Sequence, residues 1–414
     1  MFVLILKILI PFLLIFFFLP LLIWVERKGS AYIQDRRGPN RASLFGIRLG
    51  GLLHTIADVI KLITKEDIIP AHVNKPFFIL APFLALFVPC ITYAVIPFAH
   101  PIEINGAVFT FQTADINVGI LYILAMSSLG VFGVMLAGWS SNNKYSLLGG
   151  LRSSAQMFSY EIAMGLALLS VLMLGGSLEL SALIDDQTAV IWKWNFIRQP
   201  LACLLFLTAL FAEANRLPFD LPEGESELVA GYHVEYSSMK FAMFFMAEYA
   251  HMIIGSALIV TLFFGGWQVP FLSTEFLRTN AESGLFIVLL GHGVLFMIIG
   301  FFLLGKFKIG KYGDKRDYEV IVIGLPMTVI GLALGLYTLL HGSFQLGSTG
   351  QQVFTALVQF GLFMGKILFF CWVFIWIRWT LPRFRYDQLM RLGWKIMIPL
   401  GLANVAVTAV VMML

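Results

Sequence analysis

Residues 200–227 read PLACLLFLTALFAEANRLPFDLPEGESE, an apolar run that ends in a cluster of acidic residues. A second apolar run, FAMFFMAEYAHMIIGSALIVTLFFG, follows at residues 241–265. Each run is close to the roughly 20 residues that a helix needs to cross the hydrocarbon core of a bilayer. Carboxylates beside hydrocarbon are costly to keep charged and usually have a function. The stretch therefore predicts two membrane-spanning helices joined by an acidic loop that handles protons.

The rest of the chain extends this pattern. Of its 414 residues 59% are hydrophobic and 13% are charged, about half the charged share of a soluble domain. The apolar runs are continuous, whereas a membrane β-barrel shows short alternating segments. We therefore predict an all-α polytopic membrane protein with about ten transmembrane helices. The predicted spans are 3–25, 77–97, 117–139, 156–176, 200–217, 241–265, 284–305, 319–341, 352–377 and 393–413.

Basic residues are concentrated in every second connection between these spans. Those connections hold 23 of the 28 lysines and arginines, and the opposite set holds only Lys193, Arg198 and Arg278. Short basic connections stay on the cytoplasmic side of a membrane. We therefore expect the basic connections to be cytoplasmic and both termini to lie on the other side.

The first cytoplasmic connection, residues 26–75, is too long to be a simple turn. Within it, Leu52, Leu53, Ile56, Val59, Ile60 and Ile63 recur at helical spacing. Polar residues lie mostly on the other side, which predicts an amphipathic helix at the membrane interface. This helix either lies on the membrane surface alone or also docks a soluble partner.

Three acidic residues lie inside predicted spans. At a rise of about 1.5 Å per residue, Glu161 and Glu248 lie roughly 9–10 Å from the cytoplasmic ends of their helices, and Glu213 lies in the last turns of its own. Close carboxylates cannot all ionise, so they exchange protons. The alternative is that a buried base such as Lys366 pairs with one of these acids and only fixes helix packing. With the neighbouring loop, the candidate proton-relay residues are Glu161, Glu213, Asp220, Glu223, Glu225, Glu227 and Glu248.

The acidic loop also has a local pattern. Asp220 is followed three residues later by Glu223, as in a capping box, and Pro222 fits a first helical turn. A short helix from about residue 221 would place Glu223 and Glu227 on one face.

Several classes of site have no signature in this chain. The three cysteines, Cys90, Cys203 and Cys371, are far apart in apolar segments and form no CxxC pair. No Gly-rich phosphate loop follows a strand. We therefore expect this chain to bind no metal, flavin or nucleotide of its own, and no nucleic acid.

Four separate motifs, in order along most of the chain, carry a family resemblance. They are ERK (26–28) with YIQ (32–34) and RRGPN (36–40); AD (57–58) with KL (61–62) and TKE (64–66); residues 212–236 with FFMAEY (244–249); and WIR (376–378) with PRFRYDQLM (382–390). Together they resemble the family of H subunits, which are membrane subunits of NADH-quinone oxidoreductase, respiratory complex I.

The resemblance implies a non-catalytic subunit that forms the membrane side of a long quinone tunnel in a proton-pumping translocase. Quinone then binds as the substrate at the interface with soluble subunits that carry the terminal iron–sulfur cluster. Other implied partners are the small membrane subunits, the antiporter-like subunits and the lipid bilayer. It also implies a multi-pass protein of the bacterial cytoplasmic (inner) membrane with periplasmic termini. Residues implied to line or flank the tunnel are Trp24, Arg27, Arg36, Arg37, Phe219, Asp220 and Glu227, with Asp58 and Lys61 as weaker candidates.

Two features depart from the family pattern. Residues 29–31 read Gly-Ser-Ala where the family has bulkier residues, which affects the tunnel mouth. The family core has about eight spans, so residues 284–341 are expected to form an inserted helical hairpin with a basic turn. The expected division is a core at 1–283, the insert at 284–341 and two final spans at 342–414.

Two other functions fit parts of the sequence. One is the homologous membrane subunit of a membrane-bound hydrogenase-type complex. The segment 231–236 and the arginine-rich motif after residue 376 fit the quinone enzyme better than this one. The other is a free-standing ion transporter, in which the long connection and acidic loop act without a redox partner. The motifs fit ubiquinone and menaquinone equally.

Overall fold

The computed structural model describes residues 2–44, 46–104, 106–220, 229–306, 316–342 and 344–414. Within these ranges, nine helices are long and apolar enough to cross a membrane, and α8 (Pro200–Glu213) is a shorter apolar helix. Each of these ten helices overlaps one predicted span, although α5 (Lys144–Gly175) begins twelve residues before its predicted start and α8 ends four residues before its predicted end. The protein is therefore an all-α polytopic membrane protein, as predicted.

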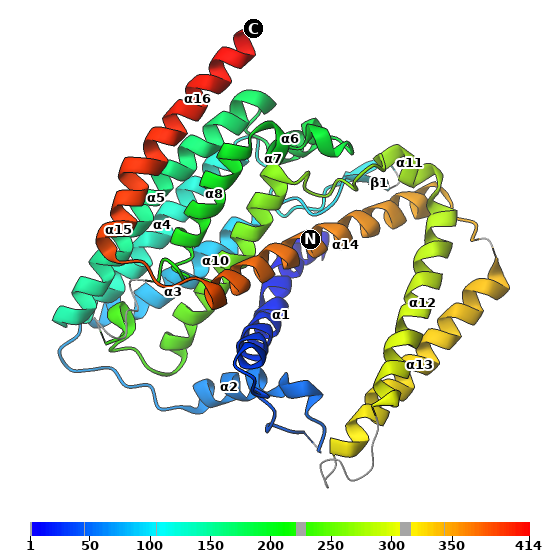
Figure 1. Cartoon of the computed structure of the whole chain (residues 1–414), viewed down its shortest axis with the longest axis horizontal. Coiled ribbons are helices and arrows are strands. Elements are labelled where there is room, and N and C mark those ends of the chain that lie inside the picture. Colours follow the sequence, from blue (N-terminus) through cyan, green and yellow to red (C-terminus); the bar gives the residue numbers. More distant parts are fainter. Residues whose placement is uncertain (1, 45, 105, 221–228, 307–315, 343) are drawn as a thin grey trace.

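The long helices follow one another along the chain and are joined by short elements at both ends (Figure 1). The long helices are α1 (Phe2–Ile33), α3 (Lys75–Thr92), α4 (Gly119–Ser140), α5 (Lys144–Gly175), α10 (Ser238–Phe263), α12 (Ala281–Gly305), α13 (Arg316–His341), α14 (Ser348–Thr380) and the continuous unit of α15 (Tyr386–Arg391), η5 (Leu392–Met397) and α16 (Ile398–Met413). The short elements are η1 (Leu49–Gly51), α2 (Leu53–Thr64), η2 (Tyr93–Val95), α6 (Leu180–Gln187), η3 (Ile191–Lys193), α7 (Asn195–Arg198), η4 (Gly231–His233) and α11 (Thr274–Thr279).

One face of the bundle carries α2 and the start of α10, and we call it the α2 face. Ser238, the first residue of α10, donates its hydroxyl to the backbone carbonyls of Leu62 and Lys65 at the end of α2, at 2.9 and 3.1 Å. Glu26 and Arg378, which lie near the ends of α1 and α14, form an ion pair. The last turns of α1 and α14 therefore also lie at the α2 face.

The core lies where α5, α8, α10 and α14 pack together. Tyr160, Phe206, Tyr249 and Phe363 are among its fully buried side chains. Helix α10 passes through the middle of this group, and most of its residues are buried. Because its surroundings are protein rather than lipid, α10 can carry polar side chains that a lipid-facing helix cannot.

The predicted amphipathic helix forms as α2. Its apolar residues Ile56, Ile60 and Ile63 are 50–60% exposed, which agrees with a position on the membrane surface or against a partner. Asp58 on α2 forms an ion pair with Arg27 of α1, so the helix is attached to the bundle. Two short strands that were not predicted, β1 (Ile102–Ile104) and β2 (Ala107–Phe109), form an antiparallel hairpin at the opposite end.

Helices α12 and α13 form a separate hairpin beside α14 (Figure 1). Glycines let the two backbones approach closely, as is common in membrane helix pairs. A Cβ atom at Gly300 would come within 2.3 Å of the Thr328 hydroxyl, and one at Gly331 within 2.6 Å of a backbone nitrogen in α12. At the α2 face, Gly50 donates its N–H to the Glu319 carboxylate at 3.2 Å.

Candidate functional site

A sharp break after α8 brings a charged side chain into the core. The helix ends at Glu213, four residues before the predicted end, because Asn215 takes a left-handed conformation with φ of 49°. Asparagine tolerates this conformation better than most residues. The buried Gln156 of α5 fixes the break by donating to the carbonyls of Ala212 and Phe219, at 2.8 and 2.9 Å. Arg216 therefore points inward.

Arg216 is the most buried member of a cluster of opposite charges, in which only Arg378 is as much as 30% exposed. We call it the Arg216 cluster, and it consists of Glu26, Arg216, Glu248 and Arg378, with the hydroxyl of Tyr249. The Arg216 guanidinium donates to Glu26 at 3.0 Å and lies 3.6 Å from Glu248. Tyr249 donates its hydroxyl to the same oxygen of Glu26 at 2.9 Å, and Arg378 pairs with the other oxygen. Two carboxylates and two guanidiniums thus balance one another inside the protein.

The surroundings of Arg216 keep it charged. Its side chain is 4% exposed, and its guanidinium lies 4.0 Å from the centre of the Tyr249 ring. The face of an aromatic ring attracts a cation, and Glu26 and Glu248 add negative charge on other sides of the same group. A guanidinium does not lose its proton in proteins. Arg216 is therefore a fixed positive charge that is held by acids of α1 and α10.

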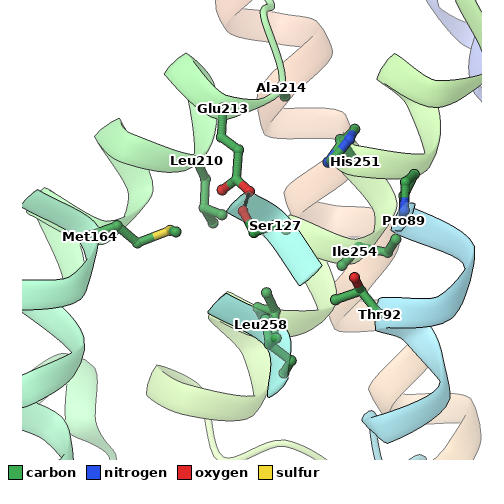
Figure 2. A pocket seen from close by; sticks show the side chains of 12 residues that line it. Pro89, Thr92, Ser127, Met164, Leu210, Glu213, Ala214, His251, Ile254 and Leu258 are labelled. Atoms are coloured by element: carbon green, nitrogen blue, oxygen red, sulfur yellow. Dashed lines mark hydrogen bonds between the residues drawn. The ribbon is translucent and has the colours of Figure 1, made fainter. Parts of the chain in front are cut away.

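The predicted acids Glu161 and Glu213 lie together at the contact of three helices. Ser127 of α4 donates its hydroxyl to Glu213, and the next residue, Ser128, donates to Glu161. Both carboxylates line the same small void, together with Ser127 and Met157. Figure 2 shows Glu213 and Ser127 facing each other, with His251 on the neighbouring helix. The structure therefore brings these two acids together, as the sequence predicted.

A larger cavity of about 570 Å³ lies between α1, α2 and α10, within the usual size range of sites for small organic ligands. Its lining is mostly apolar and includes Leu19, Ile23, Leu62, Phe241, Ala242, Phe245 and Met246. The lining also includes four charged residues, namely Arg27, Asp58, Lys61 and Lys65. Such a cavity suits an amphiphilic molecule with an apolar tail.

The other predicted tunnel residues of the first segment lie outside this lining. Trp24 donates its indole N–H to the carbonyl of Gly50 at 3.3 Å, which connects α1 to the segment before α2. Arg36 donates to Gln34 at 2.7 Å. Arg37 lines a separate cavity of about 490 Å³ with Asn40, Arg41 and Arg48. Among these residues, only Arg27 therefore borders the apolar cavity.

Phe219 and Asp220 follow Arg216 in the chain and contact α5 and the residues after α14. The Phe219 ring packs against Tyr160 and Phe384, with ring centres 5.3 and 5.5 Å apart. Asp220 is buried and accepts a hydrogen bond from Arg383 at 2.8 Å. Asp220 thus joins this segment to the loop after α14. Glu223, Glu225, Glu227 and the predicted short helix fall outside the described residues.

Lys366 is not the partner of the buried acids. Its ammonium group donates to the carbonyls of Phe264, Gly266 and Gln268, each at 2.9 Å, and lies 4.4 Å from the centre of a Trp194 ring. These carbonyls belong to the segment that follows α10, so Lys366 satisfies backbone oxygens of that segment. The alternative in which Lys366 neutralises Glu161 or Glu248 is therefore wrong.

The small residue at position 29 has a direct structural reason. A Cβ atom on Gly29 would come within 1.9 Å of the Trp379 ring of α14. The glycine thus lets Trp379 pack directly on the α1 backbone, next to the Arg378–Glu26 ion pair.

Sequence reasoning missed several residues of this site. Glu26, Arg216 and Arg378 all stand inside the motifs that carried the resemblance, so a signal existed, but nothing in the sequence paired them. Ser127 and Ser128 lie in an ordinary apolar span and carry no signal. His251 lies three residues after Glu248, and its spacing places it on the same side of α10. Among the described residues, no three histidine, cysteine or acidic side chains come close enough together to hold a metal ion.

Comparison with known proteins identifies the family. The family model described as NADH dehydrogenase matches residues 6–409. The chain is 46% identical to an H subunit of NADH-quinone oxidoreductase from Solibacter usitatus, over 93% of this chain and 90% of the relative. It is 41% identical to the H subunit of the same name from Cytophaga hutchinsonii, over 94% and 91% of the two chains. It is 43% identical to NADH-quinone oxidoreductase subunit 8 of Rhodothermus marinus, again over 94% and 91%. Because the match covers nearly the whole chain at this identity, the chain belongs to the NADH dehydrogenase family, among the H subunits of NADH-quinone oxidoreductase.

Proposed function

We propose that this chain forms the membrane side of a quinone tunnel in a proton-pumping NADH-quinone oxidoreductase and couples quinone reduction to proton movement. The single observation that carries the proposal is the order of residues along α10. Phe245 and Met246 line the apolar cavity, and Glu248 and Tyr249 belong to the Arg216 cluster. One helix thus joins a cavity for an apolar tail to buried charge within two turns.

The chemistry of the substrate fits these two environments. A quinone has a long apolar tail and a small polar ring, and its reduction to the quinol takes up two electrons and two protons. The apolar lining between α1, α2 and α10 suits the tail. Electrons come from the iron–sulfur cluster of a soluble partner, since the motifs of this chain include no redox group. The charge that appears on the ring during reduction then acts on the Arg216 cluster.

The acids beyond the cluster form the proposed proton side of the coupling. Glu248 belongs to the Arg216 cluster. Glu213 and Glu161 instead accept hydrogen bonds from Ser127 and Ser128. A change of charge at the quinone ring shifts the balance of the cluster and so the proton affinity of nearby carboxylates. The undescribed Glu223, Glu225 and Glu227 follow Asp220 and are proposed to belong to the same path.

The remaining assignments follow the same proposal. We propose that the protein lies in a bacterial cytoplasmic membrane, with the basic α2 face toward the cytoplasm and both termini in the periplasm. Its partners are soluble subunits at the α2 face, together with small membrane subunits and antiporter-like subunits. The agreement with relatives named for quinone oxidoreductases favours this function over a hydrogenase-type complex.

Filling the apolar cavity tests the quinone path. Ala242 lines the cavity and is 6% exposed, so Ala242→Trp is expected to raise the KM for a long-tailed quinone about tenfold, equivalent to the loss of about 1.4 kcal/mol of binding. Oxidation of NADH by a water-soluble acceptor should not change. The control is Val407→Trp, at a position on α16 that is 60% exposed. An unchanged quinone KM in an assembled Ala242→Trp complex would contradict the proposal.

The division into a family core and an inserted hairpin gives a second prediction. The two ends of the hairpin are close, since Leu346 donates its N–H to Glu282 at 3.0 Å. Replacing residues 284–341 by a short Gly-Ser linker is therefore expected to leave an assembled complex that retains most of its quinone reductase activity. Size-exclusion chromatography of the solubilised complex and an activity assay check this. Loss of the subunit from the complex would show that the hairpin belongs to the core.

A further inference from the structure

Two small cavities meet at the same pair of titratable residues. The first is lined by Glu213, His251, Ser127 and Thr92, and the second by Glu213, His251 and Glu248, with Asn215. Each has a volume of about 20 Å³, and a cavity of roughly 10–15 Å³ or more is enough for one water molecule. Both have polar groups on their walls, so each can hold a hydrogen-bonded water. Figure 2 shows the side chains that line the first cavity.

His251 is placed to contact both waters. It follows Glu248 by three residues on α10, so the two side chains lie on neighbouring positions of one helix face. The ring lies against Gly130 of α4, where a Cβ atom would be in ordinary contact with ring atoms Cε1 and Nε2, at 3.7 and 3.9 Å. No hydrogen bond joins either ring nitrogen to the rest of the chain as the structure describes it. Buried polar groups are normally satisfied, so the cavity waters are the natural partners.

The groups that face His251 come from three helices. Glu213 of α8 borders both cavities and is hydrogen-bonded to Ser127 of α4, with Glu161 behind it. Glu248 lies on α10 itself and is 3.6 Å from Arg216. The ring therefore borders both cavities: the first also touches Glu213, and the second touches both Glu213 and Glu248. Histidine is suited to this place because its two nitrogens accept and donate a proton at different points.

We propose that His251 is a proton carrier between Glu248 and Glu213, with one water molecule in each cavity. A proton reaches one ring nitrogen from the water on the Glu248 side, and the proton on the other nitrogen leaves to the water on the Glu213 side. A half-turn of the ring then presents the protonated nitrogen to the Glu213 side again, so the next proton can follow, and no electron moves. This inference rests on the proposed function, because it adds a residue to the proton side of the coupling.

Replacing the ring by an amide tests the role. Glutamine and asparagine keep a donor and an acceptor for the cavity waters but do not carry a proton at neutral pH. In His251→Gln and His251→Asn, protons moved per electron are expected to fall at least tenfold, because a positioned proton carrier typically contributes about 100-fold or more to the rate of proton transfer. Assembly and NADH oxidation by a water-soluble acceptor should stay unchanged. The control is Ser256→Ala, which removes a buried hydroxyl from the same helix.

Two results would overturn the inference. One is a normal proton-to-electron ratio in either amide variant. An amide can do the work of a ring that only fills space or binds water, so a normal ratio would mean that His251 carries no proton. The other comes from the wild-type complex and does not depend on a variant: a map that resolves water should show one in each cavity within hydrogen-bond distance of His251, and dry cavities would exclude the path. A failure of the quinone proposal is separate, because it appears as an unchanged quinone KM in Ala242→Trp.

Discussion

Arg216→Met is expected to abolish quinone reductase activity and to destabilise the subunit by about 3–5 kcal/mol, the usual result of removing one partner from a buried ion pair. Methionine keeps the apolar stem and removes the guanidinium, so Glu26 loses its hydrogen bond of 3.0 Å and Glu248 loses a positive neighbour at 3.6 Å. The cluster then carries one more negative than positive charge in a buried site. Thermal unfolding of the solubilised complex and quinone-dependent NADH oxidation measure the two effects.

A second substitution separates charge balance from function. Arg216→Met with Glu248→Gln restores the balance, so thermal stability should recover while quinone reduction stays low. Arg216→Lys keeps the charge but not the planar group that reaches two acids, and it should give intermediate stability. An Arg216→Met complex with the wild-type unfolding temperature and full quinone reductase activity would show that the cluster has no role in either.

The fold was predictable from the sequence because membrane spans depend on local composition. Every predicted span has its helix, and α2 forms where the apolar residues recur at helical spacing. The helix ends were less predictable. Helix α8 stops at Glu213 because Asn215 turns and Gln156, far away in the sequence, fixes the turn. Such an end depends on tertiary hydrogen bonds, which a local pattern does not contain.

The candidate site was predictable only in part. Acidic residues inside apolar segments are rare, so Glu161, Glu213 and Glu248 stood out. Their partners did not stand out, because serine is common in membrane helices and the position of a partner depends on packing. Lys366 shows the opposite error. A buried lysine suggested an ion pair, but the carbonyls at the end of α10 satisfy it instead.

Glu213→Gln is expected to reduce coupled proton translocation at least tenfold in an assembled complex, consistent with the loss of a positioned proton carrier. The substitution keeps the size of the side chain and an oxygen that accepts the Ser127 hydroxyl, so helix packing should be preserved. It removes the carboxyl that borders both small cavities and faces His251. Acidification of inverted membrane vesicles, divided by electrons passed to quinone, measures the effect.

The variants together locate the step that fails. If Glu213 carries protons, Glu213→Gln and His251→Gln interrupt one path, so the double variant should be no worse than the stronger single variant. If Glu213 only senses charge, the two losses act on different steps and should multiply. Ser256→Ala serves as the control for the loss of a buried polar group. Normal coupled pumping in an assembled variant that carries both Glu213→Gln and Glu227→Gln would remove these acids from the proton path, because neither could then exchange a proton while the enzyme turned over.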